Sequence, residues 1–437
     1  MLVNYVTKAT LTFHVLRFTM THLCLFEDDQ IDHLLPLVAT RAVYDLRLGI
    51  RTLLETTRDA FGTPPTVLHA RPLIDAVTAQ EHTLPVGYLP DAADVLFVNG
   101  RFIAEEGEVL ERLRQAARPA EPARVFVQND NVVAAWIPDA ASRLTQTDAV
   151  TRATFDGVPQ ETVAGARFIN RLWHLIDEIH PALERDFAAR TQNLDLLDRA
   201  GAHIHERAVL SDGPIYIAPG ARIRPGAILN AEDGPIFIDA DAVVMEQAVV
   251  IGPAYIGKKA QIKIGAIIED SAIGPVCKAG GEIEASLLHS YSNKQHSGFL
   301  GHSYLGRWIN LGADANTSDL RNDYGFLSLY SEAEGAFVPT ERQFLGLFMG
   351  DHSKSSINTM FNTGTVVGVS CNIYGAGFPP RYLPSFSWGS PDASGFVEYR
   401  LEKALQVAEA VMARRNKTLT DAERAVLTAI FEGRANS

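Results

Sequence analysis

Residues 235–268 run PIFIDADAVVMEQAVVIGPAYIGKKAQIKIGAII, and this stretch repeats every six residues. A large aliphatic residue recurs at the same place in each repeat, at Ile238, Val244, Val250, Ile256, Ile262 and Ile268. An alanine stands two places ahead of five of them, at Ala242, Ala248, Ala254, Ala260 and Ala266. Neither a helix, with apolar spacing near 3.6, nor a half-buried strand, with spacing of 2, has this period. The pattern is typical of a hexapeptide β-helix, in which the aliphatic side chain fills a triangular coil and the small residue turns its corner.

The same period extends on both sides of this stretch. Earlier hexads carry Ile217, Ile223 and Leu229, and later hexads carry Phe361, Val367 and Ile373. We therefore predict that residues 203–390 form the β-helix. The period fails between Leu311 and Gly346, which predicts a protruding loop, and loops on a rigid scaffold are where function is expected.

Composition narrows the class of protein. A chain of 437 residues with 46% hydrophobic content is long enough for two or three domains, each with its own core. The net charge of −13 argues against a nucleic-acid partner and against an anionic membrane surface, because both are bound by clustered Lys and Arg. Three widely spaced cysteines favour a reducing compartment, and no apolar segment is long enough to span a bilayer. We expect a cytoplasmic protein.

The rest of the chain divides by its local patterns. Residues 20–165 alternate strand and helix signals, including buried strands at 95–98 and 125–127 and a helix over 42–54, which favours an α/β, Rossmann-like domain. Four segments complete the predicted organisation: an extension over 1–19 without a folded role, a helical connector over 166–202, the β-helix, and a helical tail over 391–437. Thr420 and Glu423 have the spacing of a capping box in that tail.

Two groups of polar residues bracket the interruption of the period. His296 lies close to Lys294 before it, and His352 lies close to Lys354 after it. A neutral imidazole, whose pKa is about 6.5, can accept a proton near neutral pH, and a lysine can bind a phosphate. Either group can equally be ordinary polar surface of a β-helix.

The segment around His296 resembles the C-terminal acyltransferase domain of the bifunctional N-acetylglucosamine-1-phosphate uridylyltransferases. The matching pieces are His296, Phe299-Leu300-Gly301 and Asn310-Leu311-Gly312-Ala313, followed by Asn322-Asp323-Tyr324-Gly325. The resemblance implies that His296 is the general base that deprotonates a substrate amine for attack on an acyl-CoA thioester. It also implies that Lys294, Asn310 and Tyr324 contact the substrate.

The N-terminal part carries a second resemblance. Residues 35–43, LPLVATRAV, are similar to the end of the sugar nucleotidylyltransferase signature. With the runs GDHSK at 350–354 and FNTGTVVG at 361–368, the chain resembles the GlmU-like sugar nucleotidyltransferases. That group joins a divergent nucleotidyltransferase domain to a left-handed hexapeptide β-helix.

Two departures from the signature concern the expected nucleotide site. FEDDQ at 26–30 stands where the family has glycines, and Arg101 follows Asn99-Gly100 where a metal-binding Asp is usual. By the resemblance, Arg41, Arg47 and Arg101 are candidates to clamp phosphates, while Asp28 and Asp29 are candidates to hold Mg²⁺. Surface salt bridges on a structural domain are the alternative interpretation.

Three functions stay open from the sequence. The first is a sugar-1-phosphate nucleotidylyltransferase using Mg²⁺, the second an acyl-CoA-dependent acyltransferase acting through His296, and the third a non-catalytic sugar-nucleotide-binding scaffold. A sugar phosphate and a nucleotide are the expected partners, and the flat sides of the β-helix predict a homotrimer. Convergence of Asp28, Asp29, Arg41 and Arg101 on one pocket would favour the first function.

Overall fold

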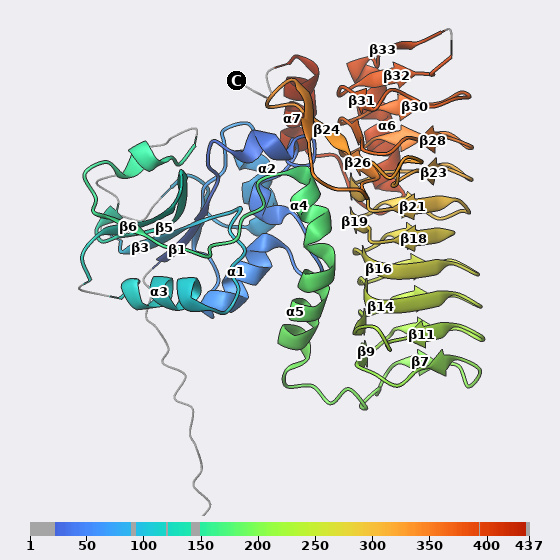
Figure 1. The fold of residues 1–437 in the computed structure, drawn as a ribbon, viewed down its shortest axis with the longest axis horizontal. Coiled ribbons are helices and arrows are strands. Elements are labelled where there is room, and N and C mark those ends of the chain that lie inside the picture. The colour runs from blue at the N-terminus through green and yellow to red at the C-terminus, as the bar shows by residue number, and fades with distance from the viewer. Residues whose placement is uncertain (1–21, 89–92, 119–120, 141–148, 393, 434–437) are drawn as a thin grey trace, which may run out of the picture.

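The computed structural model describes residues 22–88, 93–118, 121–140, 149–392 and 394–433. The expected extension over 1–19 lies outside this range. An α/β domain stands beside a long parallel β-helix, and a pair of C-terminal helices lies near the upper coils (Figure 1). This is the fold class that the sequence predicts.

The N-terminal domain is built on a six-stranded mixed sheet in the order β2-β1-β3-β5-β4-β6. The strands are β1 (His22–Phe26), β2 (Val67–Leu68), β3 (Val95–Asn99), β4 (Arg124–Gln128), β5 (Asn131–Ile137) and β6 (Gln160–Thr162). β1 runs parallel to β2 and β3, whereas β5 runs antiparallel to β3 and β4. The predicted strands at 95–98 and 125–127 are thus confirmed as β3 and β4.

Short helices cover this sheet and lead to the β-helix. They are η1 (Ile31–Leu34), η2 (Val43–Asp45), α1 (Leu53–Phe61), α2 (Asp75–His82), α3 (Glu108–Ala116), η4 (Arg152–Phe155), α4 (Leu172–Asp177) and α5 (Ile179–Thr191). The prediction of a helix over 42–54 is wrong, because only one 3-10 turn forms there before α1 begins. The capping box of Thr52 and Glu55 places the start of α1 eleven residues later than expected, since it satisfies backbone donors at that point.

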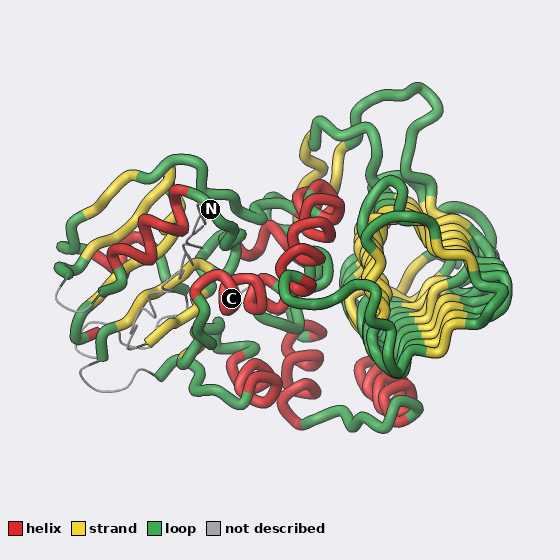
Figure 2. Tube along the Cα trace, turned by 90° about the horizontal axis from the view of Figure 1, so that it is seen from below, coloured by secondary structure: helices red, strands yellow, loops and turns green. Residues whose placement is uncertain are grey.

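The β-helix has three faces, each a ladder of short parallel strands that stack from coil to coil (Figure 2). The first face consists of β7 (His203–Ile204), β10 (Arg222–Ile223), β13 (Val243–Val244), β15 (Gln261–Ile262), β17 (Lys278–Ala279), β20 (Asn293–Lys294), β27 (Lys354–Ser355), β30 (Asn372–Ile373) and β32 (Ser387–Gly389), with the antiparallel β33 (Phe396–Glu398) at its end.

The second and third faces share two long strands that turn a corner, β14 (Val249–Ile256) and β16 (Ile267–Ile273). The second face also contains β8 (Val209–Leu210), β11 (Ile228–Asn230), β18 (Glu282–Glu284), β21 (Phe299–Gly301), β23 (Asn316–Thr317) and β28 (Met360–Phe361). The third contains β9 (Ile215–Ile217), β12 (Ile236–Ile238), β19 (Leu287–Ser290), β22 (Tyr304–Arg307), β26 (Leu347–Met349), β29 (Thr365–Val367) and β31 (Tyr382–Leu383).

The six-residue repeat corresponds directly to this geometry. Each hexad supplies one face, so Ile223, Val244 and Ile262 lie in register on successive coils of the first face. All the aliphatic residues and alanines of the repeat belong to one buried cluster inside the coil. The break in the period is a loop after β23 that carries an antiparallel hairpin, β24 (Ser328–Ser331) and β25 (Ala336–Pro339), before β26 resumes the coil.

The third face packs against the N-terminal domain. Its outward side chains, among them Phe237, Tyr255, Leu287, Tyr304 and Phe348, belong to the same hydrophobic core as the helices of that domain. The ring of Phe187 on α5 meets Phe237 edge to face at 6.3 Å. The Tyr304 hydroxyl accepts from the Arg47 backbone N–H at 3.1 Å and donates to the Arg47 carbonyl at 3.0 Å.

The chain ends in two helices, α6 (Leu401–Ala413) and α7 (Asp421–Phe431). The predicted capping box is present, since Thr420 accepts from the Glu423 backbone while Glu423 accepts from the Thr420 backbone. After α6, Arg415 donates to Asn293 on the first face at 3.1 Å. At the end of α7, the ring of Phe431 packs edge to face on that of Phe386, with the ring centroids 5.2 Å apart. Among the described residues, no helix has the length and apolar character needed to cross a membrane.

The interior stack makes a prediction about stability. Ile262 is completely buried, whereas Ile264, two residues on, is 66% exposed. Replacing Ile262 by Ala removes interior contacts and leaves a cavity between coils, so we expect the free energy of unfolding to fall by about 2–5 kcal/mol. The matched change Ile264→Ala should alter it by less than about 0.5 kcal/mol. Urea denaturation of both variants measures the difference, and equal losses would contradict the assignment of the interior face.

Candidate functional site

A cleft of about 450 Å³ opens at the carboxyl ends of β1 and β3. These strands are parallel neighbours in register from His22 opposite Val95 to Phe26 opposite Asn99. The residues that follow them, Asp28 and Arg101, therefore come together at one edge of the sheet. Ligands of α/β proteins bind at this edge, outside the carboxyl ends of the parallel strands.

A buried ion pair forms the floor of the cleft. Arg101 is fully buried and Asp28 is 5% exposed. Arg101 donates through Nε to Asp28 Oδ1 at 2.9 Å and through Nη2 to Asp28 Oδ2 at 2.5 Å. The Asn99 side-chain amide also donates to Asp28 Oδ2, at 2.7 Å, and the Gln30 backbone N–H donates to Oδ1 at 3.2 Å. Each oxygen of the Asp28 carboxylate thus already accepts two hydrogen bonds.

This arrangement does not suit Asp28 as a ligand for Mg²⁺. A bound Mg²⁺ requires free carboxylate oxygens in near-octahedral geometry. Here the cation next to Asp28 is the guanidinium of Arg101, and displacing it would leave a buried charge without a partner. Asp29, the other expected metal ligand, lines the same cleft but is exposed, and Gln30 donates to it at 3.1 Å.

Arg101 also orients two asparagines that the sequence analysis missed. Its Nη2 donates to Asn131 Oδ1 at 2.7 Å, and its Nη1 donates to Asn170 Oδ1. Both asparagines line the cleft, and among the described residues no partner is found for their Nδ2 amide groups. Each side chain is therefore held by its oxygen, which leaves two N–H donors for a ligand.

Two further cations line the mouth of the cleft. Arg152 is exposed, and Arg171 is partly buried beside His33. Arg171 donates to Glu334 at 2.6 Å, and Glu334 lies in the turn between β24 and β25. The loop that interrupts the β-helix thus reaches the cleft of the other domain. The sequence gives only a weak indication of Arg171, namely its position directly before an apolar helix.

Arg41 and Arg47, the other expected phosphate ligands, lie outside this cleft. Arg41 is 1% exposed and pairs with Asp351 of the β-helix. Arg47 is 8% exposed, donates to the Ile50 carbonyl, and lies over the ring of Tyr255 at 5.7 Å. Of the four residues that a nucleotide site would bring together, Asp28, Asp29 and Arg101 line one cleft and Arg41 does not. Arg41 and Arg47 lie outside the cleft because both side chains contact the β-helix at the interface between the two domains.

The residues after the interruption also serve that interface. Asp351 accepts from Thr40 Oγ1 at 2.7 Å and from the Arg307 backbone at 2.7 Å, in addition to Arg41. His352 is buried with its ring nearly parallel to that of Trp308, and burial together with Lys354 lowers the pKa of His352 to about 3. Burial lowers the pKa of Lys354 to about 8, and its ammonium donates to the His352 carbonyl at 2.7 Å.

Lys294 and His296, which precede the interruption, point in different directions. Lys294 occupies an interior position of the first face and is 1% exposed, and its ammonium donates to the carbonyls of Gly280, His296 and Ser297 at 2.6–3.1 Å. Burial lowers the pKa of Lys294 to about 8. A phosphate at Lys294 would have to displace all three carbonyls. His296 is exposed at the corner between the first and second faces.

Asn310 and Tyr324 complete the expected acyltransferase set. Asn310 lies one coil above His296 on the first face and accepts from Asn293 at 3.4 Å. Tyr324 is 68% exposed in the loop that carries the hairpin. The structure therefore places His296 and Asn310 on adjacent coils of the β-helix and puts Tyr324 on the protruding loop.

One comparison with known proteins concerns the N-terminal domain. Residues 23–194 match the model of a family described as sugar nucleotidyl transferase. The match covers the N-terminal domain together with α4 and α5 and ends before the β-helix. The N-terminal domain joined to a hexapeptide β-helix is the GlmU-like arrangement that the sequence resembles. Comparison with curated proteins finds no match.

Solved structures similar to this chain include three acyltransferases. A UDP-N-acetylglucosamine acyltransferase from Campylobacter jejuni is 12% identical over 52% of this chain and 95% of its own, with a TM-score of 0.31. The enzyme of the same name from Francisella novicida is 16% identical over 50% and 74%, with a TM-score of 0.20. The Arabidopsis enzyme is 13% identical over 50% and 80%, with a TM-score of 0.24. Likeness at this level says nothing about activity.

The buried contact between Asp351 and Arg41 predicts a pH-dependent stability. Burial by itself raises the pKa of Asp351, but Arg41 and Arg307 outweigh it and hold the pKa below the ordinary 3.8. Asp351→Asn leaves Arg41 buried without a counter-charge, so we expect a loss of about 3–5 kcal/mol near pH 7. Because the folded-state pKa is depressed, this contribution is present above about pH 4 and disappears as the pH falls further.

Urea denaturation of Asp351→Asn between pH 3 and pH 7 measures this effect. The control is Asp323→Asn, which removes an exposed partner of Arg321 and should leave the midpoint unchanged. A loss for Asp351→Asn that is independent of pH would contradict the proposed charge interaction.

Proposed function

We propose that the cleft at the ends of β1 and β3 binds a sugar phosphate together with a nucleotide, and that the protein is a sugar-1-phosphate nucleotidylyltransferase. The supporting observation is the arrangement around Arg101. The guanidinium, fixed by Asp28, holds Asn131 and Asn170 so that their amide donors remain available in a cleft of the sugar nucleotidyl transferase domain. The cleft has the size of a small-ligand site.

The chemistry of this family accounts for the charges at the mouth. In nucleotidyl transfer, a phosphate oxygen of the sugar phosphate attacks the α-phosphorus of a nucleoside triphosphate, a new P–O bond forms, and pyrophosphate leaves in line. Negative charge shifts to the departing oxygen, and fixed cations and N–H donors stabilise it. Arg152 and Arg171 are the cations that the cleft supplies, and the two asparagines are the neutral donors.

The requirement for Mg²⁺ is a separate part of the proposal. The family implies Mg²⁺, but Asp28 offers it no free oxygen. We therefore assign binding and orientation of the phosphates to Arg152, Arg171, Asn131 and Asn170. A sugar-nucleotide-binding protein without turnover is the related alternative, because the same donors would bind a ligand even if no reaction followed.

Ligand binding tests the proposal. Isothermal titration calorimetry of the full chain with a panel of hexose-1-phosphates and nucleoside diphosphate sugars should find one ligand, and Asn131→Ala and Asn170→Ala should each weaken it about tenfold, the loss of one hydrogen bond. Arg112→Met is the control, since Arg112 pairs with Glu161 outside the cleft and the affinity should not change.

Pyrophosphate release with the same panel, with and without Mg²⁺, separates the two forms of the proposal. Release that both asparagine variants impair supports nucleotidyl transfer. Binding without release supports the non-catalytic alternative, and neither binding nor release across the panel would remove the cleft from consideration.

A second candidate function, acyl transfer from acyl-CoA to an amino-sugar phosphate, is favoured by the position of His296. This side chain is exposed where the first face turns into the second. The first coils of the second face carry three exposed apolar side chains in one column, Val209, Ile228 and Ile267, which are between 36% and 54% exposed. We propose that this face contacts a neighbouring copy in a homotrimer, so that His296 lies in a groove between subunits and deprotonates the amine there.

Release of free CoA with an amino-sugar phosphate and an acyl-CoA panel tests this second function. His296→Ala should reduce the rate at least about 100-fold, because general-base catalysis typically contributes that much. His205→Ala is the control, since His205 is also exposed near the same corner, on the first coil of the β-helix. Equal rates for the two variants, or a stable monomer by sedimentation, would contradict the proposed site.

We also propose a cytoplasmic location. Cys24, Cys277 and Cys371 are free and buried, as expected where thiols stay reduced. Burial raises the pKa of Cys277 to about 12, so this thiol is packed as a small apolar side chain. The sugar, the nucleobase and the acyl group are the specific properties that the panels above would identify.

A further inference from the structure

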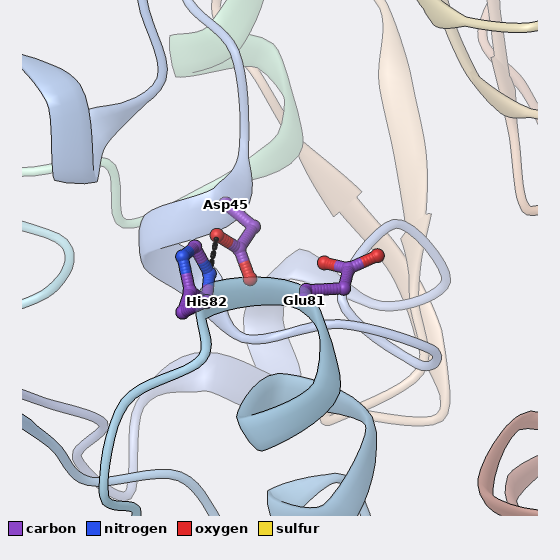
Figure 3. Close-up of side chains that lie close together, drawn as sticks. All are labelled: Asp45, Glu81 and His82. Carbon is purple, nitrogen blue, oxygen red and sulfur yellow. Dashed lines mark hydrogen bonds and ion pairs between the residues drawn. The ribbon is translucent and has the colours of Figure 1, made fainter.

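Three potential metal ligands gather at the domain interface, away from the cleft. Asp45 ends η2, while Glu81 and His82 end α2. One ligand atom from each residue lies within 4.8 Å of the others (Figure 3). None of the three lines the cleft at the ends of β1 and β3.

One atom in this group lacks the partner that burial demands. Asp45 is 4% exposed, and its Oδ1 accepts from His82 Nε2 at 2.8 Å. Its Oδ2 is buried and no hydrogen bond reaches it from the described residues. Figure 3 shows that this second oxygen points between His82 and Glu81. A buried carboxylate oxygen without a donor or a cation is costly, so the site calls for one.

The position of Asp45 is set by the β-helix. His289 on β19 donates through Nε2 to the Asp45 backbone carbonyl at 2.8 Å. The ring of His82 meets that of Tyr44 edge to face at 6.3 Å, which holds the imidazole beside Asp45. Two of the three groups are thus oriented by packing around them, as pre-formed ligand sites require.

Arg307 of β22 is the cation already present nearby. It pairs with Glu81 through Oε1, and it leaves Asp45 Oδ2 unpartnered. Glu81 is exposed, and its second oxygen is not engaged by any contact described for the chain. Glu81 can therefore keep Arg307 on one oxygen and offer the other to an ion. A water on Asp45 Oδ2, with Arg307 as the sole counter-charge, is the simpler alternative.

The donor set suits a divalent transition metal better than Mg²⁺. One imidazole nitrogen with two carboxylate oxygens is a common three-residue ligand set for Zn²⁺, and water can take the fourth position. Ligand atoms of a tetrahedral site lie about 3.3 Å apart at metal–ligand distances near 2.0–2.1 Å. The three ligand atoms lie within 4.8 Å of one another, so they must move closer together to bind an ion, and rotation of the exposed Glu81 side chain can supply this movement.

We propose that Asp45, Glu81 and His82 bind one divalent transition metal ion of the Zn²⁺ class. The ion would be bound by Asp45 Oδ2, one Glu81 oxygen and His82 Nε2. Binding releases to solvent the Nε2 proton that now hydrogen-bonds to Asp45 Oδ1, because a ligating imidazole nitrogen must be deprotonated. Because His289 and Arg307 come from the β-helix, the bound ion stiffens the junction between the two domains. This inference is independent of the cleft and of its reaction.

Metal titration of the full chain tests the site without any activity assay. Calorimetry with Zn²⁺, after removal of metals by a chelator, should show one ion bound per chain, and Co²⁺ should give the visible absorption of a tetrahedral complex. Asp45→Asn and His82→Gln should each weaken Zn²⁺ binding more than about tenfold, since each removes one of three protein ligands. Should Asp45→Asn fail to fold, His82→Gln still decides the question.

The matched control is His180→Ala. His180 also lies beside carboxylates, at 3.0 Å from Asp270 and 3.9 Å from Glu184. It is exposed, however, and each of its ring nitrogens lies near one of these two carboxylates. Zn²⁺ affinity should be unchanged in this variant. Binding that survives His82→Gln, binding lost equally in His180→Ala, or no binding at millimolar Zn²⁺ would each overturn the proposal.

Discussion

The stacking of one aliphatic side chain per hexad inside a closed parallel coil is the constraint on which the rest of this structure depends. Each interior residue, such as Ile262, packs on the equivalent residue of the coils above and below it. Because side chains alternate along a strand, this register also determines which residues face outward. The third face thereby becomes a flat apolar surface, and the N-terminal domain docks on it.

Docking on that face explains why Arg41 and Arg47 lie outside the cleft. A buried guanidinium needs a carboxylate, because desolvation of an unpaired charge is very costly. Arg41 finds Asp351 across the interface, and Arg51 finds Asp186 on α5 at 2.7 Å. Arg101 finds Asp28 beneath the cleft. These residues orient other groups, and the cations at the mouth of the cleft are Arg152 and Arg171, the second of which also pairs with Glu334.

The two domains are also linked at the site itself. The loop that interrupts the β-helix brings Glu334 to Arg171 at the mouth of the cleft. The same loop carries Tyr324, which the acyltransferase resemblance singles out. One loop thus connects the regions proposed for nucleotidyl and acyl chemistry, and a ligand that changes the position of Arg171 would act on the loop through Glu334.

The sequence by itself determined what depends on neighbouring residues. The β-helix, its interruption, the strands β3 and β4 and the capping box at Thr420 follow from local spacing, because each rests on a repeat or contact of a few residues. The tertiary structure alone decided the rest. Residues 42–52 form one 3-10 turn and an irregular segment that contacts Tyr304. The side chain of Lys294 lies inside the coil, and Arg41 pairs with a carboxylate 310 residues away. Such contacts depend on burial and on pairing between residues that are distant in the sequence, so a local sequence pattern does not predict them.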